Sequence, residues 1–109
     1  TVTGSSFGNA ITFGTGTSPI SVTMSDLDGD GWLDAIITNN GAASVSVFFN
    51  RGVTGSLSTN SFATRVDFTV GSVPRNAIAA DINGDGKPEI ITTNGTANTI
   101  SVLFNRCVK

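Results

Sequence analysis

The chain has 109 residues, a formal net charge of −2 at pH 7 and only 13% charged residues. This length suits one small domain or a piece of a longer protein. The basic residues are few and dispersed, which argues against nucleic acid as a partner, and no apolar run is long enough to span a membrane. Histidine and tyrosine are absent. Acid–base and nucleophilic catalysis therefore have few candidate residues, and we expect no enzyme.

The sequence is rich in glycine, serine, threonine and asparagine and has no long helix-forming run, which is typical of an all-β chain with short turns. Apolar and polar residues alternate over short segments, with the period of two that indicates strands. A hairpin turn is expected at residues 39–43 and a polar connector at 53–60. In chain order, the alternation predicts strands at residues 7–13, 20–25, 33–39, 44–49, 62–70, 75–80, 89–93 and 99–104.

The second half of the chain repeats the first at a constant spacing of 55 residues, as from Phe7 to Phe62 and from Gly16 to Gly71. The match has no gap, and it extends to Phe-Asn-Arg at the end of each unit. A fixed period in this size range is typical of repeat architectures, propellers included. We therefore divide the chain into a first repeat at residues 1–54 and a second at residues 56–109.

Acidic residues are concentrated in two stretches, Asp26–Asp34 and Asp81–Glu89, and only Asp67 lies elsewhere. Each stretch places oxygen-bearing side chains at alternate positions around two glycines. Such crowding of carboxylates is repulsive unless a cation offsets it, and calcium takes six to eight oxygen ligands in irregular geometry. The expected side-chain ligands are Asp26, Asp28, Asp30 and Asp34 in the first loop, and Asp81, Asn83, Asp85 and Glu89 in the second.

The backbone carbonyls of Trp32 and Lys87 complete the two expected calcium sites, one in each loop. Gly31 and Gly86 occupy the sharp turn, where positive φ is expected. The helix–loop–helix calcium hand is rejected because its twelfth position would require a glutamate, and Ile37 stands there in the first loop. Magnesium fits less well because it prefers strict octahedral geometry. An ion-free Asp/Asn/Gly turn is the alternative interpretation.

The chain resembles FG-GAP/VCBS-type repeats through Phe7-Gly8, the Gly16 to Pro19 segment, the Asp-x-Asp-Gly-Asp-Gly loop and the closing Val-Ser-Val-Phe-Phe-Asn. The resemblance covers both units. It implies four-stranded antiparallel propeller blades with calcium in the loop between the first two strands, as in integrin α-subunit heads and bacterial surface lectins. It also implies a secreted or cell-surface location and a structural or binding role.

The expected fold class is therefore all-β, with two four-stranded antiparallel β-propeller blades. Two blades cannot close a propeller, so the chain is an excised piece of a larger adhesin or lyase, a two-blade sandwich, or a unit that oligomerises with several copies of itself into a ring. Residues 7–13 match an outer strand that the second blade lacks. We expect this segment to act as a clasp on a neighbouring copy, or else to lie over its own chain.

A carbohydrate-binding, lectin-type propeller is the second functional interpretation. Its candidate residues are Trp32 as a stacking platform and Asn39, Asn40, Asn94 and Asn98 as amide partners. A protein ligand is also open. The single cysteine, Cys107, cannot form an internal disulfide, so it is either an unreactive thiol near the end of the chain or a site of intermolecular pairing.

Overall fold

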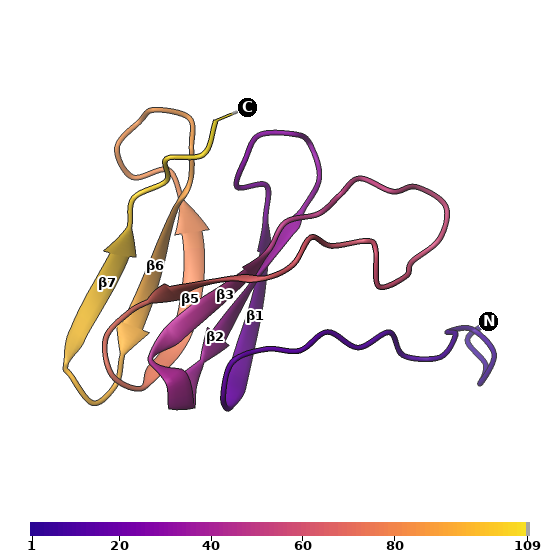
Figure 1. Ribbon diagram of the computed structural model, residues 1–109, viewed down its shortest axis with the longest axis horizontal. Helices are drawn as coiled ribbons and strands as arrows, with labels where there is room; N and C mark the ends of the chain where they lie inside the picture. The colour runs from indigo at the N-terminus through magenta and orange to yellow at the C-terminus, as the bar shows by residue number, and fades with distance from the viewer. Residues whose placement is uncertain (109) are drawn as a thin grey trace.

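The computed structural model describes residues 1–108, which fold into two antiparallel β-sheets with no α-helix in that range. Figure 1 shows the two sheets packed side by side. The first has the order β1-β2-β3-β4 and the second β5-β6-β7. No helix in the described chain has the length and apolarity needed to cross a membrane. The elements are β1 (Pro19–Ser25), β2 (Asp34–Asn39), the 3₁₀ turn η1 (Asn40–Ala42), β3 (Ser44–Phe48), β4 (Val66–Thr69), β5 (Pro74–Ala80), β6 (Glu89–Asn94) and β7 (Thr99–Leu103).

The prediction of an all-β chain with two antiparallel sheets is confirmed, and seven of the predicted strands form in the predicted order. The expected four strands form in the first sheet, and the second sheet has three strands within one chain. Residues 7–13 form no strand in the structure; they lie in an extended, largely exposed N-terminal arm (Figure 1). A strand requires a hydrogen-bonding neighbour along its edge, and this chain pairs no strand with that segment.

The two sheets share local details that follow from the repeat. Both begin with a proline whose pairing is followed by a register shift, at Pro19 and at Pro74. The turn between the second and third strands of each sheet ends in a left-handed residue, Ala43 with φ of +50° and Asn98 with φ of +55°. The predicted hairpin at residues 39–43 is thus a 3₁₀ turn followed by one left-handed residue.

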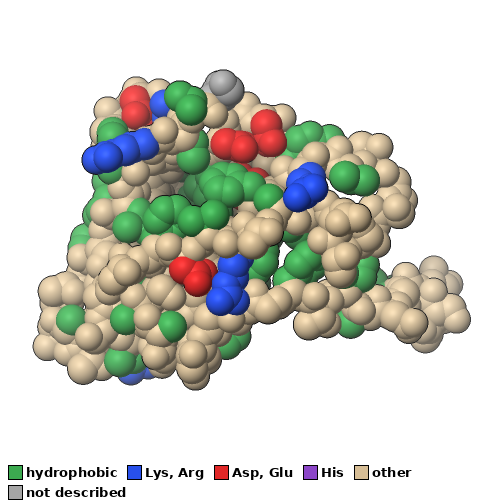
Figure 2. All heavy atoms as spheres, viewed as in Figure 1, with side chains coloured by type: hydrophobic (Ala, Val, Ile, Leu, Met, Phe, Trp, Pro, Cys, Tyr) green, Lys and Arg blue, Asp and Glu red, His purple; other side chains and the backbone are tan. Residues whose placement is uncertain are grey.

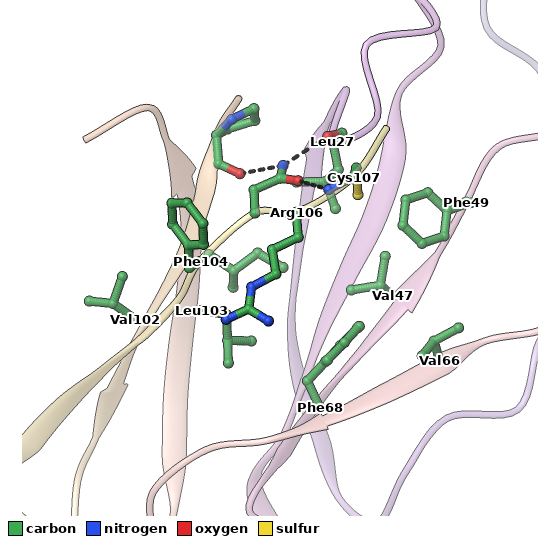
Figure 3. A pocket seen from close by; sticks show the side chains of 13 residues that line it. Leu27, Val47, Phe49, Val66, Phe68, Val102, Leu103, Phe104, Arg106 and Cys107 are labelled. Atoms are coloured by element: carbon green, nitrogen blue, oxygen red, sulfur yellow. Dashed lines mark hydrogen bonds between the residues drawn. The ribbon is translucent and has the colours of Figure 1, made fainter. Parts of the chain in front are cut away.

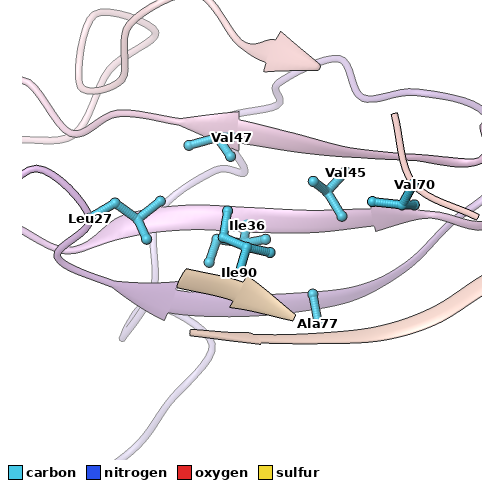
Figure 4. Packing of buried hydrophobic residues seen from close by; sticks show 7 residues of the cluster. All are labelled: Leu27, Ile36, Val45, Val47, Val70, Ala77 and Ile90. Atoms are coloured by element: carbon cyan, nitrogen blue, oxygen red, sulfur yellow. The ribbon is translucent and has the colours of Figure 1, made fainter. Parts of the chain in front are cut away.

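The core lies between the two sheets, where apolar residues of the first sheet face those of the second (Figure 4). Val45 and Val47 of β3 and Ile36 of β2 are fully buried, and Ala77 of β5 and Ile90 of β6 face them. Because successive side chains of a strand point to opposite faces, these residues place one apolar face of each sheet against the other; in β3 the buried Val45 and Val47 alternate with serines. The hydrophobic effect therefore holds the sheets together as stacked layers.

Buried asparagines at corresponding places in the two sheets explain a repeated glycine. The side-chain amide of Asn94 donates to Thr99 and Ser101 at 3.1 and 2.8 Å. A Cβ on Gly71 would lie 2.5 Å from that amide, and a Cβ on Gly16 would lie 2.7 Å from the amide of Asn39. Only glycine allows this close backbone approach, which accounts for the glycine at both positions of the repeat.

A groove of about 610 Å³ opens between the two sheets, lined by β4 on one side and β7 with the C-terminal segment on the other (Figure 3). Figure 2 shows hydrophobic side chains gathered in this hollow. Phe68, Leu103 and Arg106 are among its lining residues. Cys107 is half-buried there, and burial raises the pKa of its thiol, which disfavours the reactive thiolate.

Candidate metal centre

The two acidic loops lie at the same end of the two sheets, because each connects the first strand of its sheet to the second (Figure 1). Residues 26–33 join β1 to β2, and residues 81–88 join β5 to β6. The last antiparallel pair before the loop is Ser25–Asp34 in the first sheet and Ala80–Glu89 in the second. Both loops therefore start from the same hairpin frame, as the repeat predicts.

Asp26 folds the first loop around its own carboxylate. Its Oδ1 accepts backbone N–H bonds from Gly29 and Asp30 at 2.9 and 3.2 Å, and its Oδ2 accepts one from Gly31 at 2.9 Å. The amide bonds, led by that from Gly31, hold the pKa of Asp26 below its usual value. Gly31 has φ of +89°, which confirms the predicted left-handed turn.

The second loop repeats this arrangement with Asp81 as its first residue. Asp81 accepts backbone N–H bonds from Gly84 and Gly86 at 2.9 and 2.8 Å. Gly86 has φ of +86°, which again confirms the prediction, and Gly84 also has positive φ. The two loops therefore adopt one shape even though their side chains differ.

The middle residues of each loop accept hydrogen bonds from amides two positions ahead. Asp30 Oδ1 accepts from the amide of Trp32, and Asp85 Oδ1 accepts from that of Lys87, both at 2.9 Å. Asn83 Oδ1 takes the place of Asp28 Oδ1 and accepts from Asp85 at 3.2 Å. The amide of Asn83 has no second oxygen, and its Nδ2 donates to Asp85 Oδ2 at 3.5 Å.

The last acidic residue of each loop is buried, and here the two loops differ. Asp34 is fully buried, with Oδ2 accepting from Leu27 at 2.8 Å and Oδ1 from Asn50 at 2.8 Å. Glu89 is 1% exposed, and its Oε1 accepts from Ile82 at 3.0 Å. The second carboxylate oxygen, Glu89 Oε2, is buried without any hydrogen-bond partner.

Three carboxylates of the first loop converge tightly enough that they could hold a metal ion. One oxygen each from Asp26, Asp28 and Asp34 lies within 4.8 Å of the others. Burial raises the pKa of Asp28, and the charge of Asp34 adds to this effect. Burial also raises the pKa of Asp34. Desolvated, mutually repelling carboxylates of this kind are favourable binding groups for a cation.

Some predicted ligand residues lie outside this triad. Asp30 is exposed and does not belong to it. In the second loop, the amide of Asn83 replaces one carboxylate, so the charge is lower there. The side chain of Trp32 packs on Gly52, since a Cβ built at Gly52 would lie 2.7 Å from the indole Nε1. The side chain of Trp32 thus makes its contact outside the acidic loop.

Two asparagines that the sequence analysis did not single out support the loops. Asn50 donates through its backbone to Asp34 and through Nδ2 to the carbonyl of Leu33 at 2.9 Å. Asn105 donates through Nδ2 to the carbonyl of Pro88 at 2.7 Å and to that of Leu27 at 2.8 Å. Both asparagines are the middle residue of the repeated Phe-Asn-Arg, and this repetition is the sequence signal that could have indicated their role. The bond to Leu27 joins the two sheets across the core.

The candidate sugar-binding set does not converge in the structure. Asn39 and Asn94 are buried, and their amides bond to serine and threonine hydroxyls inside their own sheets. Trp32 lies at the opposite end of β2 from Asn39, and a strand of this length spans roughly 15–20 Å. The structure therefore does not bring Trp32 and Asn39 together, and the carbohydrate-binding interpretation stays a prediction.

The fold and the paired loops define a β-propeller-type repeat module. A family model described as an FG-GAP-like repeat matches residues 26–92, which is more than half of the chain and includes both acidic loops. The chain belongs to this FG-GAP-like repeat family. Searches of curated proteins and of solved structures gave no significant match.

Proposed function

We propose that this chain is a calcium-binding propeller module, with one calcium ion in each acidic loop and a structural and binding role outside the cell. The residues that would hold the ions are the ten that the sequence indicated. They are Asp26, Asp28, Asp30, the carbonyl of Trp32 and Asp34 in the first loop, and Asp81, Asn83, Asp85, the carbonyl of Lys87 and Glu89 in the second.

The observation that carries this proposal is the unpartnered oxygen of Glu89. A buried polar atom without a hydrogen bond costs about 1–3 kcal/mol, and more when it is charged. Glu89 Oε2 is such an atom, and it belongs to the ninth position of an acidic loop. A cation bound in the second loop supplies the missing partner. An ion-free turn gives no reason to bury this oxygen.

The first loop also suits calcium, but it carries one more carboxylate than the second loop, since Asp28 stands where the second has Asn83. Its three converging carboxylates offer the hard oxygen ligands that calcium prefers. Asp34 is already oriented by the amides of Leu27 and Asn50, so little rearrangement is required for it to take part in binding. Once bound, calcium neutralises the repulsion between the carboxylates and ties the two strands that leave each loop.

The proposed role is therefore stabilisation of the blade, because an ion that binds only the folded chain raises its stability by mass action. Extracellular calcium modules bind in the range of roughly 10⁻⁴–10⁻³ M, which fits loops that are exposed at one end of the sheets. We propose that several copies then close into a ring, since each terminal sheet keeps one unpaired face.

Isothermal titration of the chelator-treated chain with calcium tests the proposal. We expect binding at two sites for each chain, together with a rise in Tm measured at fixed protein concentration. Magnesium at equal concentration should raise Tm less, because it keeps its water ligands. Identical Tm values in calcium and in chelator would refute the role of calcium.

A further inference from the structure

The interface between the two sheets has a counterpart at each end of the molecule. We call β1–β4 the first blade and β5–β7 the second. The first blade contributes Leu27, Val45 and Val47 to the core. The residues 55 positions later are Ile82, Ile100 and Val102, and they are 59%, 64% and 46% exposed. The second blade therefore presents to solvent the same face that the first blade buries.

The complementary surface is the face of the first blade that points away from the second blade. The second blade contacts the core through Ala77 and Ile90. The equivalent residues of the first blade are Val22, which is 64% exposed, and Ala35, which is buried at 8% exposure, so Val22 is the exposed member of this pair. The second blade has an alanine at the first position and a larger residue at the second, Ala77 and Ile90. The first blade has the reverse order, Val22 and Ala35, so the two pairs fill a similar volume. The interface within one chain thus indicates how a second copy would pack.

The N-terminal arm already lies where the outer strand of a preceding blade would be. Phe13 packs edge-on against Phe48 at 5.9 Å between ring centroids. Their equivalents in the second repeat are Phe68 and Leu103, which line the same groove between the blades. A second pocket is lined by Phe13, Phe48 and Arg51, the counterparts of Phe68, Leu103 and Arg106 in the groove. The arm therefore faces the first blade as β4 faces the second.

One side-chain donor also lacks the partner that its repeat equivalent has. Asn105 Nδ2 donates both to its own blade, at the Pro88 carbonyl, and to the preceding blade, at the Leu27 carbonyl. Asn50 Nδ2 donates to its own blade at the Leu33 carbonyl. Its second bond would reach the carbonyl at position 82 of a preceding copy, which is the counterpart of Leu27.

We propose that a second copy docks head to tail on the second blade and inserts residues 11–14 as its fourth strand, beside β7. This inference rests on the ring assembly proposed above and specifies its contact. The register follows from β3 and β4, where Val47 pairs with Val66 and Val45 with Phe68. Shifted by one repeat, Val102 pairs with Ile11 of the second copy, and Ile100 pairs with its Phe13.

Disulfide trapping between copies tests this register. In a Cys107→Ser background, Ile11→Cys with Val102→Cys places two thiols directly opposite each other, at a Cα separation of about 4.5–5.5 Å that a disulfide can span. We expect covalent multimers on a non-reducing gel after mild oxidation. The matched control, Ile11→Cys with Ser101→Cys, is one residue out of register and should remain mostly uncrosslinked. Each single-cysteine chain should give dimers at most.

A second variant tests the face itself and does not depend on cysteine chemistry. Ile100 is 64% exposed in the single chain, so Ile100→Asp should fold but weaken association by about tenfold or more in sedimentation velocity. Leu57 lies in the connector between β3 and β4 and is 75% exposed, so Leu57→Asp is the control and should leave association unchanged. Equal association of Ile100→Asp and the unmodified chain would overturn the proposed face.

The outcomes separate this inference from the proposals on which it rests. Multimers that trap only in the out-of-register pair, or in neither pair, would overturn the strand insertion and leave ring assembly standing. A monomer at all concentrations would overturn both. The calcium proposal is judged separately, from the calcium-dependent rise in Tm, which a monomer can still display.

Discussion

Replacing Glu89 by glutamine should make the chain more stable in chelator and less stable in abundant calcium. The substitution keeps the size of the side chain and an oxygen for the amide of Ile82, which lies 3.0 Å from Glu89 Oε1. It removes the charge at the buried oxygen that has no partner. Exchange of this buried, unpartnered charge for a neutral amide should stabilise the calcium-free chain, by less than the full cost of the charge because the buried amide nitrogen then needs an acceptor of its own.

In calcium the balance reverses, because the second site loses its only fully buried carboxylate. A ligand at about 100 times its Kd stabilises a folded chain by about 2.7 kcal/mol, and at about 1,000 times by about 4.1 kcal/mol. Loss of this increment at one site outweighs the gain from removing the unpartnered charge. For a chain of this length, 1 kcal/mol corresponds to a change in Tm of roughly 4 °C or somewhat more, so the order of the two Tm values should invert.

The assay is thermal unfolding of both chains at equal protein concentration, followed by circular dichroism in chelator and across a calcium series. Asp67→Asn is the matched control, because Asp67 is the acidic residue outside the loops. It bonds to Ser46 at 2.6 Å and pairs with Arg65, so its loss should shift both Tm values alike. A Glu89→Gln chain that is less stable in chelator, or that keeps the full calcium increment, would refute the reasoning.

Three further substitutions follow from the same contacts. Asp34→Asn should destabilise the chain in chelator as well as in calcium, by about 1–3 kcal/mol, because both Asp34 oxygens already accept amide bonds; urea unfolding would measure it, and a gain in chelator would contradict it. Gly71→Ala should cost about 1–3 kcal/mol because its Cβ would lie 2.5 Å from the Asn94 amide, whereas Gly4→Ala meets no atom within 4 Å and should be neutral in the same assay. Asn105→Ala should cost about 1–3 kcal/mol through the carbonyls of Leu27 and Pro88 that lose their donor, and an unchanged urea midpoint would show that water replaces it.

The loops and most strands could be predicted because their signals are local. Alternation with a period of two sets the strand, and the Asp-x-Asp-Gly-Asp-Gly pattern sets the turn, since its first aspartate bonds amides three to five residues ahead in both loops. The positive φ of Gly31 and Gly86 follows from the same short segment. The turns need nothing beyond neighbouring residues to form, whereas each strand also needs a partner edge within reach.

The remainder depends on contacts between distant parts of the chain. Asn50 meets Asp34 across 16 positions, and Asn105 meets Leu27 across 78. Whether Glu89 keeps one oxygen unpartnered depends on its extra methylene and on the position of the neighbouring backbone, which the sequence pattern does not encode. The absence of a strand at residues 7–13 has the same origin, because alternation reports a tendency to pair and says nothing about whether an edge is within reach.

The packing of Trp32 on Gly52 has a practical consequence. This is the only tryptophan in the chain, it is 40% exposed, and it belongs to one acidic loop and not to the other. Its intrinsic fluorescence is therefore an optical probe built into the first loop. Emission recorded during a titration would follow that loop alone, while circular dichroism would follow the whole chain.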